Sequence, residues 1–260
     1  MSSPANFPKK SLGQHFLKDP NTARIVAAGV TGEDVVLEIG AGRGFLTAFL
    51  AQRARLVHAV ELDPDVLPAL RRATGNNVRI HVGDALRFDY GALEPAPNKL
   101  VANLPYNVAS PLVLMLLEEV RYLERLRFMV QLEVARRMAA ERGTKDYAAY
   151  AVLVQLLAGV SIAHRVSPAV FDPPPQVYSA IVDMERRGPD LEPAEYRGVK
   201  DLVLASFRSR RKRLVNNLPE PVRAEAPRIL DSLGYGPDAR AEELGPEDFV
   251  ALYRAVGWAL

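Results

Sequence analysis

Short apolar runs alternate with amphipathic segments over the first half of the chain. Runs typical of strands occupy residues 35–40, 56–63, 78–86 and 99–106. Helical periodicity follows the first run over residues 44–54 and the second over residues 63–74. This alternation predicts a mainly parallel sheet with helices on both faces, which is an α/β fold.

The pattern changes toward the C-terminus. Residues 128–138 begin as a strand and continue as a helix, and residues 166–184 hold a proline cluster followed by an alternating strand. A linker-like stretch then precedes short helical patterns over residues 195–218, 222–234 and 246–260. We therefore predict a first domain over residues 1–187 and a small all-helical domain over residues 188–260.

Composition narrows the possible functions. The 260 residues carry 48% hydrophobic and 25% charged side chains, which is typical of a globular protein, and the net charge is only +2. The chain has no cysteine, which excludes disulfides, thiolate nucleophiles and cysteine-ligated metals, and its four scattered histidines indicate no metal site. No secretory signal and no apolar stretch of membrane-spanning length is present, so we expect a cytoplasmic protein with no membrane partner.

Candidate ligand-binding residues stand where the predicted strands end. The segment LEIGAGRGFLT places Gly40, Gly42 and Gly44 between a strand and a helix, where a backbone can approach a ligand closely. A dinucleotide fingerprint would require glycine at Phe45, which weakens a nicotinamide interpretation. Acidic residues end the next two strands, Glu61 and Asp84. Either acid alone could be a turn or cap residue, but together with the glycines they predict an adenosine-bearing cofactor.

The fourth strand ends in Asn-Leu-Pro-Tyr, residues 103–106. The glycine loop, Glu61, the GDA element at residues 83–85 and this NLPY motif together resemble class I S-adenosylmethionine methyltransferases that act on an exocyclic amine of adenine. The chain further resembles the rRNA adenine N6,N6-dimethyltransferases in SLGQHFL, VQLEVARRM, FDPPPQVYSA and FRSRRKRLVNN. The resemblance implies a Rossmann-like methyltransferase sheet followed by a helical C-terminal domain.

Site residues follow from this resemblance and from the chemistry of adenine. The side-chain oxygen of Asn103 and the carbonyl of Leu104 can accept the two hydrogens of the amine N6, while the ring of Tyr106 can stack on the base. The implied catalytic set is Asn103, Leu104, Pro105, Tyr106 and Phe171. The implied cofactor-binding set is His15, Leu17, Gly40, Gly42, Glu61, Asp84, Ala85 and Asn103.

A basic run predicts contact with RNA. Residues 207–214, FRSRRKRL, contain Arg208, Arg210, Arg211, Lys212 and Arg213. On a helix these side chains would cover more than one face, which suits a phosphate backbone better than a solvated surface. The alternative is a charge run that only keeps a helix solvated. Further candidates for the footprint are Lys9, Lys10, Arg136 and Arg137.

The resemblance implies a substrate and leaves alternatives. Members of the family dimethylate two adjacent adenosines in a hairpin loop near the 3′ end of 16S rRNA, and we expect this activity from a monomer. Departures from the family pattern at Ala41, at Tyr178 and over residues 148–151 bear on the loop and on the fit to RNA. The open alternatives are a 23S rRNA methyltransferase of the antibiotic-resistance type, a non-catalytic ribosome-assembly factor and, most weakly, a nicotinamide oxidoreductase.

Overall fold

The computed structural model describes residues 8–9, 12–187, 191–220 and 222–256. The chain divides into two compact units, one made of Met1–Ala135 with Val160–Arg186 and the other of Arg136–Gly159 with Arg187–Leu260. No helix in the described part of the chain is long and apolar enough to cross a membrane.

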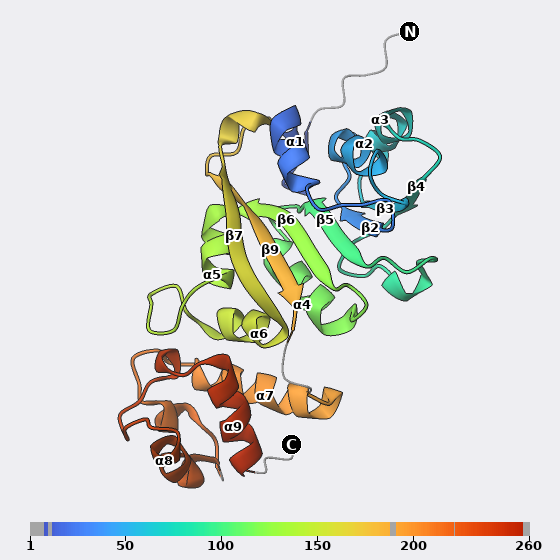
Figure 1. The fold of residues 1–260 in the computed structure, drawn as a ribbon. Coiled ribbons are helices and arrows are strands. Elements are labelled where there is room, and N and C mark those ends of the chain that lie inside the picture. Colours follow the sequence, from blue (N-terminus) through green and yellow to red (C-terminus); the bar gives the residue numbers. More distant parts are fainter. Residues whose placement is uncertain (1–7, 10–11, 188–190, 221, 257–260) are drawn as a thin grey trace. The chain divides into compact units, whose positions relative to one another are not determined.

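A seven-stranded sheet organises the described residues of the first unit (Figure 1). Its strand order is β4-β3-β2-β5-β6-β9-β7. The strands β2, β3, β4, β5 and β6 pair in parallel, whereas β9 is antiparallel to β6. The bounds are β2 Val35–Ile39, β3 Leu56–Glu61, β4 Val78–Val82, β5 Lys99–Asn103, β6 Arg125–Gln131, β7 Ala158–Val166 and β9 Ser179–Arg186. All the strands predicted from the apolar runs are therefore present.

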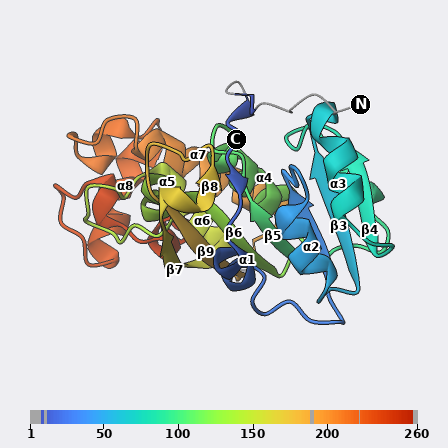
Figure 2. The same cartoon turned by 90° about the horizontal axis from the view of Figure 1, so that it is seen from above.

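Helices cover both faces of this sheet, as the alternating pattern predicted. Seen from above, α1 and α2 lie on one side and α4 on the other (Figure 2). Val36 of β2 and Val57 of β3 are fully buried in a core cluster with Val26 of α1 and Leu50 of α2, and burial on both faces explains why these parallel strands are almost wholly apolar. The helix bounds are α1 Pro20–Val26, α2 Phe45–Ala51, α3 Leu67–Ala73, α4 Ala109–Glu119 and α5 Leu132–Met138.

Three short 3-10 helices and a separate pair of strands complete the described part of the first unit. The 3-10 helices are η2 Pro64–Val66, η3 Tyr90–Ala92 and η4 Pro168–Val170. The strand pair joins β1, Phe16–Leu17, to β8, Phe171–Asp172, in antiparallel register. This pairing ties the N-terminal segment to the proline-rich segment of the chain.

The second unit is helical in its described residues. Its elements are α6 Ala149–Leu157, α7 Pro193–Ser206, η5 Leu214–Asn217, α8 Val222–Ser232, η6 Ala241–Glu243 and α9 Pro246–Val256. Residues 136–159, which we expected in the first domain, group with this unit. The reason is hydrogen bonding to the C-terminal part of the chain, because the Tyr147 hydroxyl donates to the carbonyl of Leu244 at 2.9 Å and the Gly143 N–H donates to that of Glu242 at 2.7 Å.

The basic run does not lie on a helix, so that part of the prediction was wrong. Helix α7 ends at Ser206, and residues 207–213 form turns before η5. The Nδ2 of Asn217 donates to the carbonyls of Ser206 and Ser209, at 2.7 and 3.0 Å. These bonds satisfy carbonyls that the end of a helix leaves open, so they stabilise the turn at this position. The side chains of Arg208, Arg210, Arg211, Lys212 and Arg213 are exposed there.

Candidate active site

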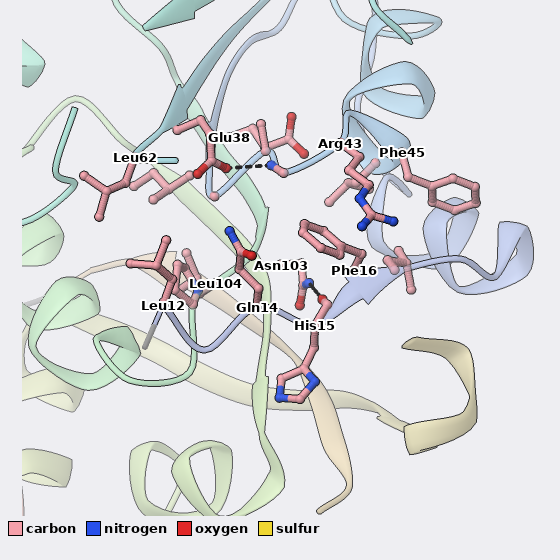
Figure 3. A pocket seen from close by; sticks show the side chains of 18 of the residues that line it. Leu12, Gln14, His15, Phe16, Glu38, Arg43, Phe45, Leu62, Asn103 and Leu104 are labelled. Carbon is pink, nitrogen blue, oxygen red and sulfur yellow. Dashed lines mark hydrogen bonds between the residues drawn. The ribbon is translucent and has the colours of Figure 1, made fainter. Parts of the chain in front are cut away.

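A cavity of about 560 Å³ lies at the carboxyl edge of the sheet (Figure 3). Side chains reach it from the N-terminal segment, the loop after β2, the ends of β3 and β4, and the segment after β5. Nearly all the residues predicted for cofactor and base lie around this one cavity, namely His15, Leu17, Gly40, Gly42, Glu61, Asp84, Ala85, Asn103, Leu104, Pro105 and Tyr106. The strand ends therefore bring together residues that are up to 91 positions apart in the chain (from His15 to Tyr106).

The loop after β2 needs its glycines. Gly40 and Gly42 have φ angles of 75° and 56°, which side chains rarely adopt. A Cβ on Gly40 would lie 3.2 Å from the ring of Pro105, and one on Gly42 would lie 3.0 Å from the ring of Phe16. The loop thus packs against NLPY on one side and against the N-terminal segment on the other.

Glu61 organises the edge where a ribose would bind. Its side chain is 7% exposed, and it accepts the N–H of Gly42 at 2.7 Å and the N–H of Asp63 at 2.8 Å. A carboxylate has about four acceptor sites, so both oxygens can still accept further hydrogen bonds. Asp84 is exposed and accepts the N–H of Leu86 at 3.0 Å. Both acids therefore stabilise turns by accepting backbone N–H groups. Their carboxylate oxygens can still accept hydrogen bonds from a ligand in the cavity.

Asn103 carries an acceptor without a partner. Its Nδ2 donates to the carbonyl of His15 at 3.1 Å, which fixes the orientation of the amide. Its Oδ1 is buried and has no hydrogen-bond partner among the described residues. Leu104 follows with its N–H donated to the carbonyl of Met129 at 3.1 Å, which holds the peptide plane. Since buried acceptors are rarely left unpaired, the Asn103 oxygen points to a donor on a ligand.

Tyr106 is fixed by its hydroxyl. The hydroxyl shares a short hydrogen bond with that of Ser179, and burial raises the pKa of the Tyr106 phenol. Its ring centroid lies 5.3 Å from that of His15, whose Nδ1 is 2.8 Å from the carbonyl of Pro173. The ring is thus held at one wall of the cavity beside the Asn103 amide.

Phe171 does not face the cavity, contrary to the prediction. Its side chain is fully buried and belongs to a core cluster that includes Leu17, Met129 and Ile181. The backbone of Phe171 pairs with that of Leu17 in β1 and β8, and both side chains belong to this cluster. In this structure Phe171 is a core residue, so we assign no base-stacking role to it.

Glu38 is a site residue that the sequence did not reveal. It lies in β2, lines the cavity and is 1% exposed, and its Oε2 has no hydrogen-bond partner among the described residues. Burial raises its pKa to about 8, an effect that the nearby Thr47 hydroxyl opposes and the Glu61 carboxylate reinforces. The only sequence signal was an acid inside an otherwise apolar strand.

Glu38 should make the stability of the protein depend on pH. Glu38 ionises at an ordinary pKa in the unfolded chain and near 8 in the folded protein, so the free energy of unfolding should fall as pH rises between these values. The loss is about 1.4 kcal/mol per pH unit. We expect Glu38→Gln to remove it, so that the variant gains stability over the wild type between pH 5 and pH 8. Denaturant unfolding at pH 5 and pH 8 measures the free energy of unfolding of both proteins. The prediction would be contradicted if the difference between variant and wild type were the same at the two pH values.

Two of the predicted RNA-binding side chains already have partners. The guanidinium of Arg210 donates to the carbonyl of Lys145 at 2.7 Å and lies 3.7 Å from the Glu242 carboxylate, and Arg213 lies 2.8 Å from Asp238. Arg208, Arg211 and Lys212 form the remaining exposed part of the run. Lys9 pairs with acids near Glu61, and Lys10 lies outside the described residues.

The departures from the family pattern have local structural settings. Tyr178 is 45% exposed, and the Arg165 guanidinium lies 3.8 Å from its ring centroid. Ala148 occupies the N-cap of α6, where no side chain caps the helix. Ala41 is buried in the loop after β2. Among the described residues, no group of three histidines, aspartates or glutamates is arranged to hold a metal ion.

Known proteins of similar sequence share one activity in their names. A family model described as ribosomal RNA adenine dimethylase matches residues 5–256. A ribosomal RNA small subunit methyltransferase A from Rubrobacter xylanophilus is 73% identical over 96% of this chain and 95% of its own length. A protein of the same name from Gluconobacter oxydans is 43% identical, over 94% of this chain and 82% of its own.

Two solved structures share the fold over nearly the full length of this chain. A dimethyladenosine transferase from Plasmodium falciparum has a TM-score of 0.80 at 25% identity and covers 94% of this chain and 98% of its own. The 23S rRNA methyltransferase ErmE has a TM-score of 0.73 at 28% identity and covers 94% of this chain and all of its own. The chain belongs to the ribosomal RNA adenine dimethylase family.

Proposed function

We propose that this protein transfers methyl groups from S-adenosylmethionine to N6 of two adjacent adenosines near the 3′ end of 16S rRNA. The product at each site would be N6,N6-dimethyladenosine. The observation that carries the proposal is the buried Oδ1 of Asn103, an acceptor without a partner among the described residues at the point where the glycine loop and the NLPY motif meet. An amine hydrogen of adenine is the donor that this acceptor suits.

The acceptor groups around the cavity fit S-adenosylmethionine. Glu61 keeps acceptor capacity for the two ribose hydroxyls, and Asp84 keeps an oxygen for the adenine amine of the cofactor. The Glu61 carboxylate in the lining suits a ligand that carries positive charge. Ala85, His15 and Leu17 would complete this side of the cavity. When bound, the cofactor supplies an electrophilic methyl group on a positively charged sulfur.

The chemistry left to the chain is positioning and polarisation. Adenine N6 is a poor nucleophile because its lone pair is delocalised into the ring. Asn103 Oδ1 and the Leu104 carbonyl would accept the two N6 hydrogens and so favour a nitrogen whose lone pair is available for attack. Pro105 fixes the backbone between them, and Tyr106 would stack on the base. The target must leave its helix to reach this site, at a cost of a few kcal/mol that stacking partly offsets.

Contact with RNA beyond the base would fall to the exposed basic residues of the second unit. Arg208, Arg211 and Lys212 are the strongest candidates, while Arg210 and Arg213 would have to exchange acidic partners for phosphate. We further propose that residues 188–260 serve mainly to bind RNA, and that the protein acts as a cytoplasmic monomer in the biogenesis of the small subunit.

The small subunit is favoured over the large subunit by the relatives. Three curated proteins at 73%, 43% and 41% identity carry the name of a small-subunit methyltransferase. The structural similarity to ErmE covers the same length of chain, so the fold alone does not discriminate between the two substrates.

Methyl transfer to isolated subunits tests this proposal. The protein, labelled S-adenosylmethionine and subunits that lack the modification would be incubated, with small and large subunits in parallel. We expect labelled dimethyladenosine from small subunits alone. Product from large subunits alone would assign the protein to the resistance-type enzymes, and cofactor binding without product on either would contradict the proposed reaction.

A further inference from the structure

Asp63 is a buried carboxylate outside the residues assigned so far. It is 1% exposed and stands two residues beyond Glu61, just after β3. Its own N–H donates to Oε1 of Glu61 at 2.8 Å, and its Oδ1 accepts the N–H of Asp65 at 3.0 Å as the cap of η2. Asp63 therefore fixes the turn that orients the Glu61 carboxylate.

The same carboxylate binds the N-terminal segment. We call Lys9 together with residues 12–17 the strap. Lys9 Nζ lies 2.6 Å from Oδ1 of Asp63, and Gln14 Nε2 donates to its Oδ2 at 2.8 Å. The backbone N–H of Lys9 also donates to Oε1 of Gln14 at 2.8 Å. Both oxygens of Asp63 are thus bonded to the strap, and these bonds hold the pKa of Asp63 below its usual value against the opposing effect of burial.

The strap crosses the cavity between two anchors. Its other end is held where Asn103 donates to the carbonyl of His15 and where Phe16 and Leu17 pair with β8. Residues between the anchors line the cavity, among them Gly13 and also Leu12 and Gln14 (Figure 3). Asp63 is accordingly the anchor next to Glu61, and Asn103 is the anchor next to the target base.

Burial gives this anchor its strength. A buried carboxylate that loses its partners is left with an uncompensated charge. Release of the strap would leave Asp63 in this state, so the ionised Asp63 favours the bound position of the strap. Asp65 provides a comparison within the same turn, because it also lies 2.7 Å from Lys9 Nζ but is 58% exposed. Exposed ion pairs contribute little, so Asp65 should add far less to the anchoring.

We propose that Asp63 is a positioning residue that sets cofactor affinity by holding the strap over the cavity and the Glu61 carboxylate in place. The proposal rests on the function given above, in which S-adenosylmethionine occupies the side of the cavity next to Glu61. Asp63 touches neither substrate in this account. Its loss should raise the dissociation constant and the KM for the cofactor and leave kcat at saturation nearly unchanged.

The test compares Asp63→Asn with Asp65→Asn in the full chain. The asparagine keeps the size of the side chain but places an amide donor against Lys9 or Gln14. Binding of S-adenosylhomocysteine is measured by calorimetry, and KM and kcat by methyl transfer. We expect Asp63→Asn to weaken binding and raise KM by at least about tenfold, whereas Asp65→Asn should change both by less than about twofold.

Proteolysis measures the strap without any ligand. Trypsin cleavage after Lys9 or Lys18, followed by mass spectrometry, should be faster in Asp63→Asn than in the wild type or in Asp65→Asn. Gln14→Ala removes one hydrogen bond from the strap to Asp63 and leaves the turn after β3 intact. It therefore tests the anchor even if Asp63→Asn does not fold. It should also speed cleavage and weaken binding.

Several outcomes would overturn the proposal. These are equal effects of Asp63→Asn and Asp65→Asn, a fall in kcat at unchanged KM, or a Gln14→Ala variant with wild-type cleavage and affinity. A wild-type protein that neither binds S-adenosylhomocysteine nor transfers methyl groups would instead refute the proposed function, while the cleavage rates would still test the anchor itself.

Discussion

Asn103→Ala should lower kcat for methyl transfer by about 10²–10³-fold, the effect of removing one hydrogen-bonding group that acts on a reacting centre. The change deletes the buried Oδ1 that has no partner in the described part of the chain and that we assign to an N6 hydrogen. It also removes the bond from Nδ2 to the carbonyl of His15, so binding of S-adenosylhomocysteine should weaken by no more than about fivefold. Single-turnover rates and calorimetry measure the two quantities separately.

Asn21→Ala is the matched control for this variant. It makes the same chemical change on the exposed first turn of α1, where the Asn21 side chain accepts a hydrogen bond from Arg24. Its turnover and affinity should equal those of the wild type. Full turnover in Asn103→Ala would refute the role assigned to the amide, and a loss of cofactor binding as large as the loss of turnover would reassign Asn103 to the cofactor alone.

Glu61→Ala should weaken binding of S-adenosylmethionine by at least about 100-fold. Hydrogen bonds to a charged acceptor contribute about 1.5–3 kcal/mol each, and the proposed ribose contact includes two. The substitution also leaves the N–H groups of Gly42 and Asp63 without their acceptor, which loosens the loop after β2. Glu61→Gln keeps one oxygen and should lose less affinity. Calorimetry with S-adenosylhomocysteine measures both variants.

Glu33→Ala serves as the control for the loss of charge, because Glu33 is an exposed acid just before β2. Its affinity for the cofactor should not change. Thermal unfolding of each variant separates an effect on the site from a general loss of stability. Binding within twofold of the wild type in Glu61→Ala would contradict the assignment of this carboxylate to the cofactor.

The residues around the cavity could be predicted because each stands at the end of a strand that the local sequence pattern reveals. Parallel strands end at one edge of a sheet, so Gly40, Glu61, Asp84 and Asn103 must meet there once each strand is recognised. The apolar runs were clear because these strands are buried on both faces. Alternating strands and helices predicted a mainly parallel sheet but not its strand order, in which β2 lies between β3 and β5.

What could not be predicted depends on packing between distant segments. Phe171 is a core residue because β1 and β8 pair across more than 150 positions, which no local pattern reveals. The turn at residues 207–213 depends on Asn217, whose side chain bonds back to the end of α7. The roles of Glu38 and Asp63 depend on their buried positions, because Glu38 lies near Glu61 and Asp63 bonds to the strap.

The most direct test of the proposed activity is to map the modified bases. Dimethylation removes both hydrogens of N6 and blocks base pairing, so a reverse transcriptase should stop at each modified adenosine. Small subunits treated with the protein and S-adenosylmethionine should give stops at two adjacent adenosines in the 3′-terminal hairpin of 16S rRNA, and untreated subunits should give none. Stops confined to 23S rRNA, or an absence of new stops in both RNAs, would contradict the account.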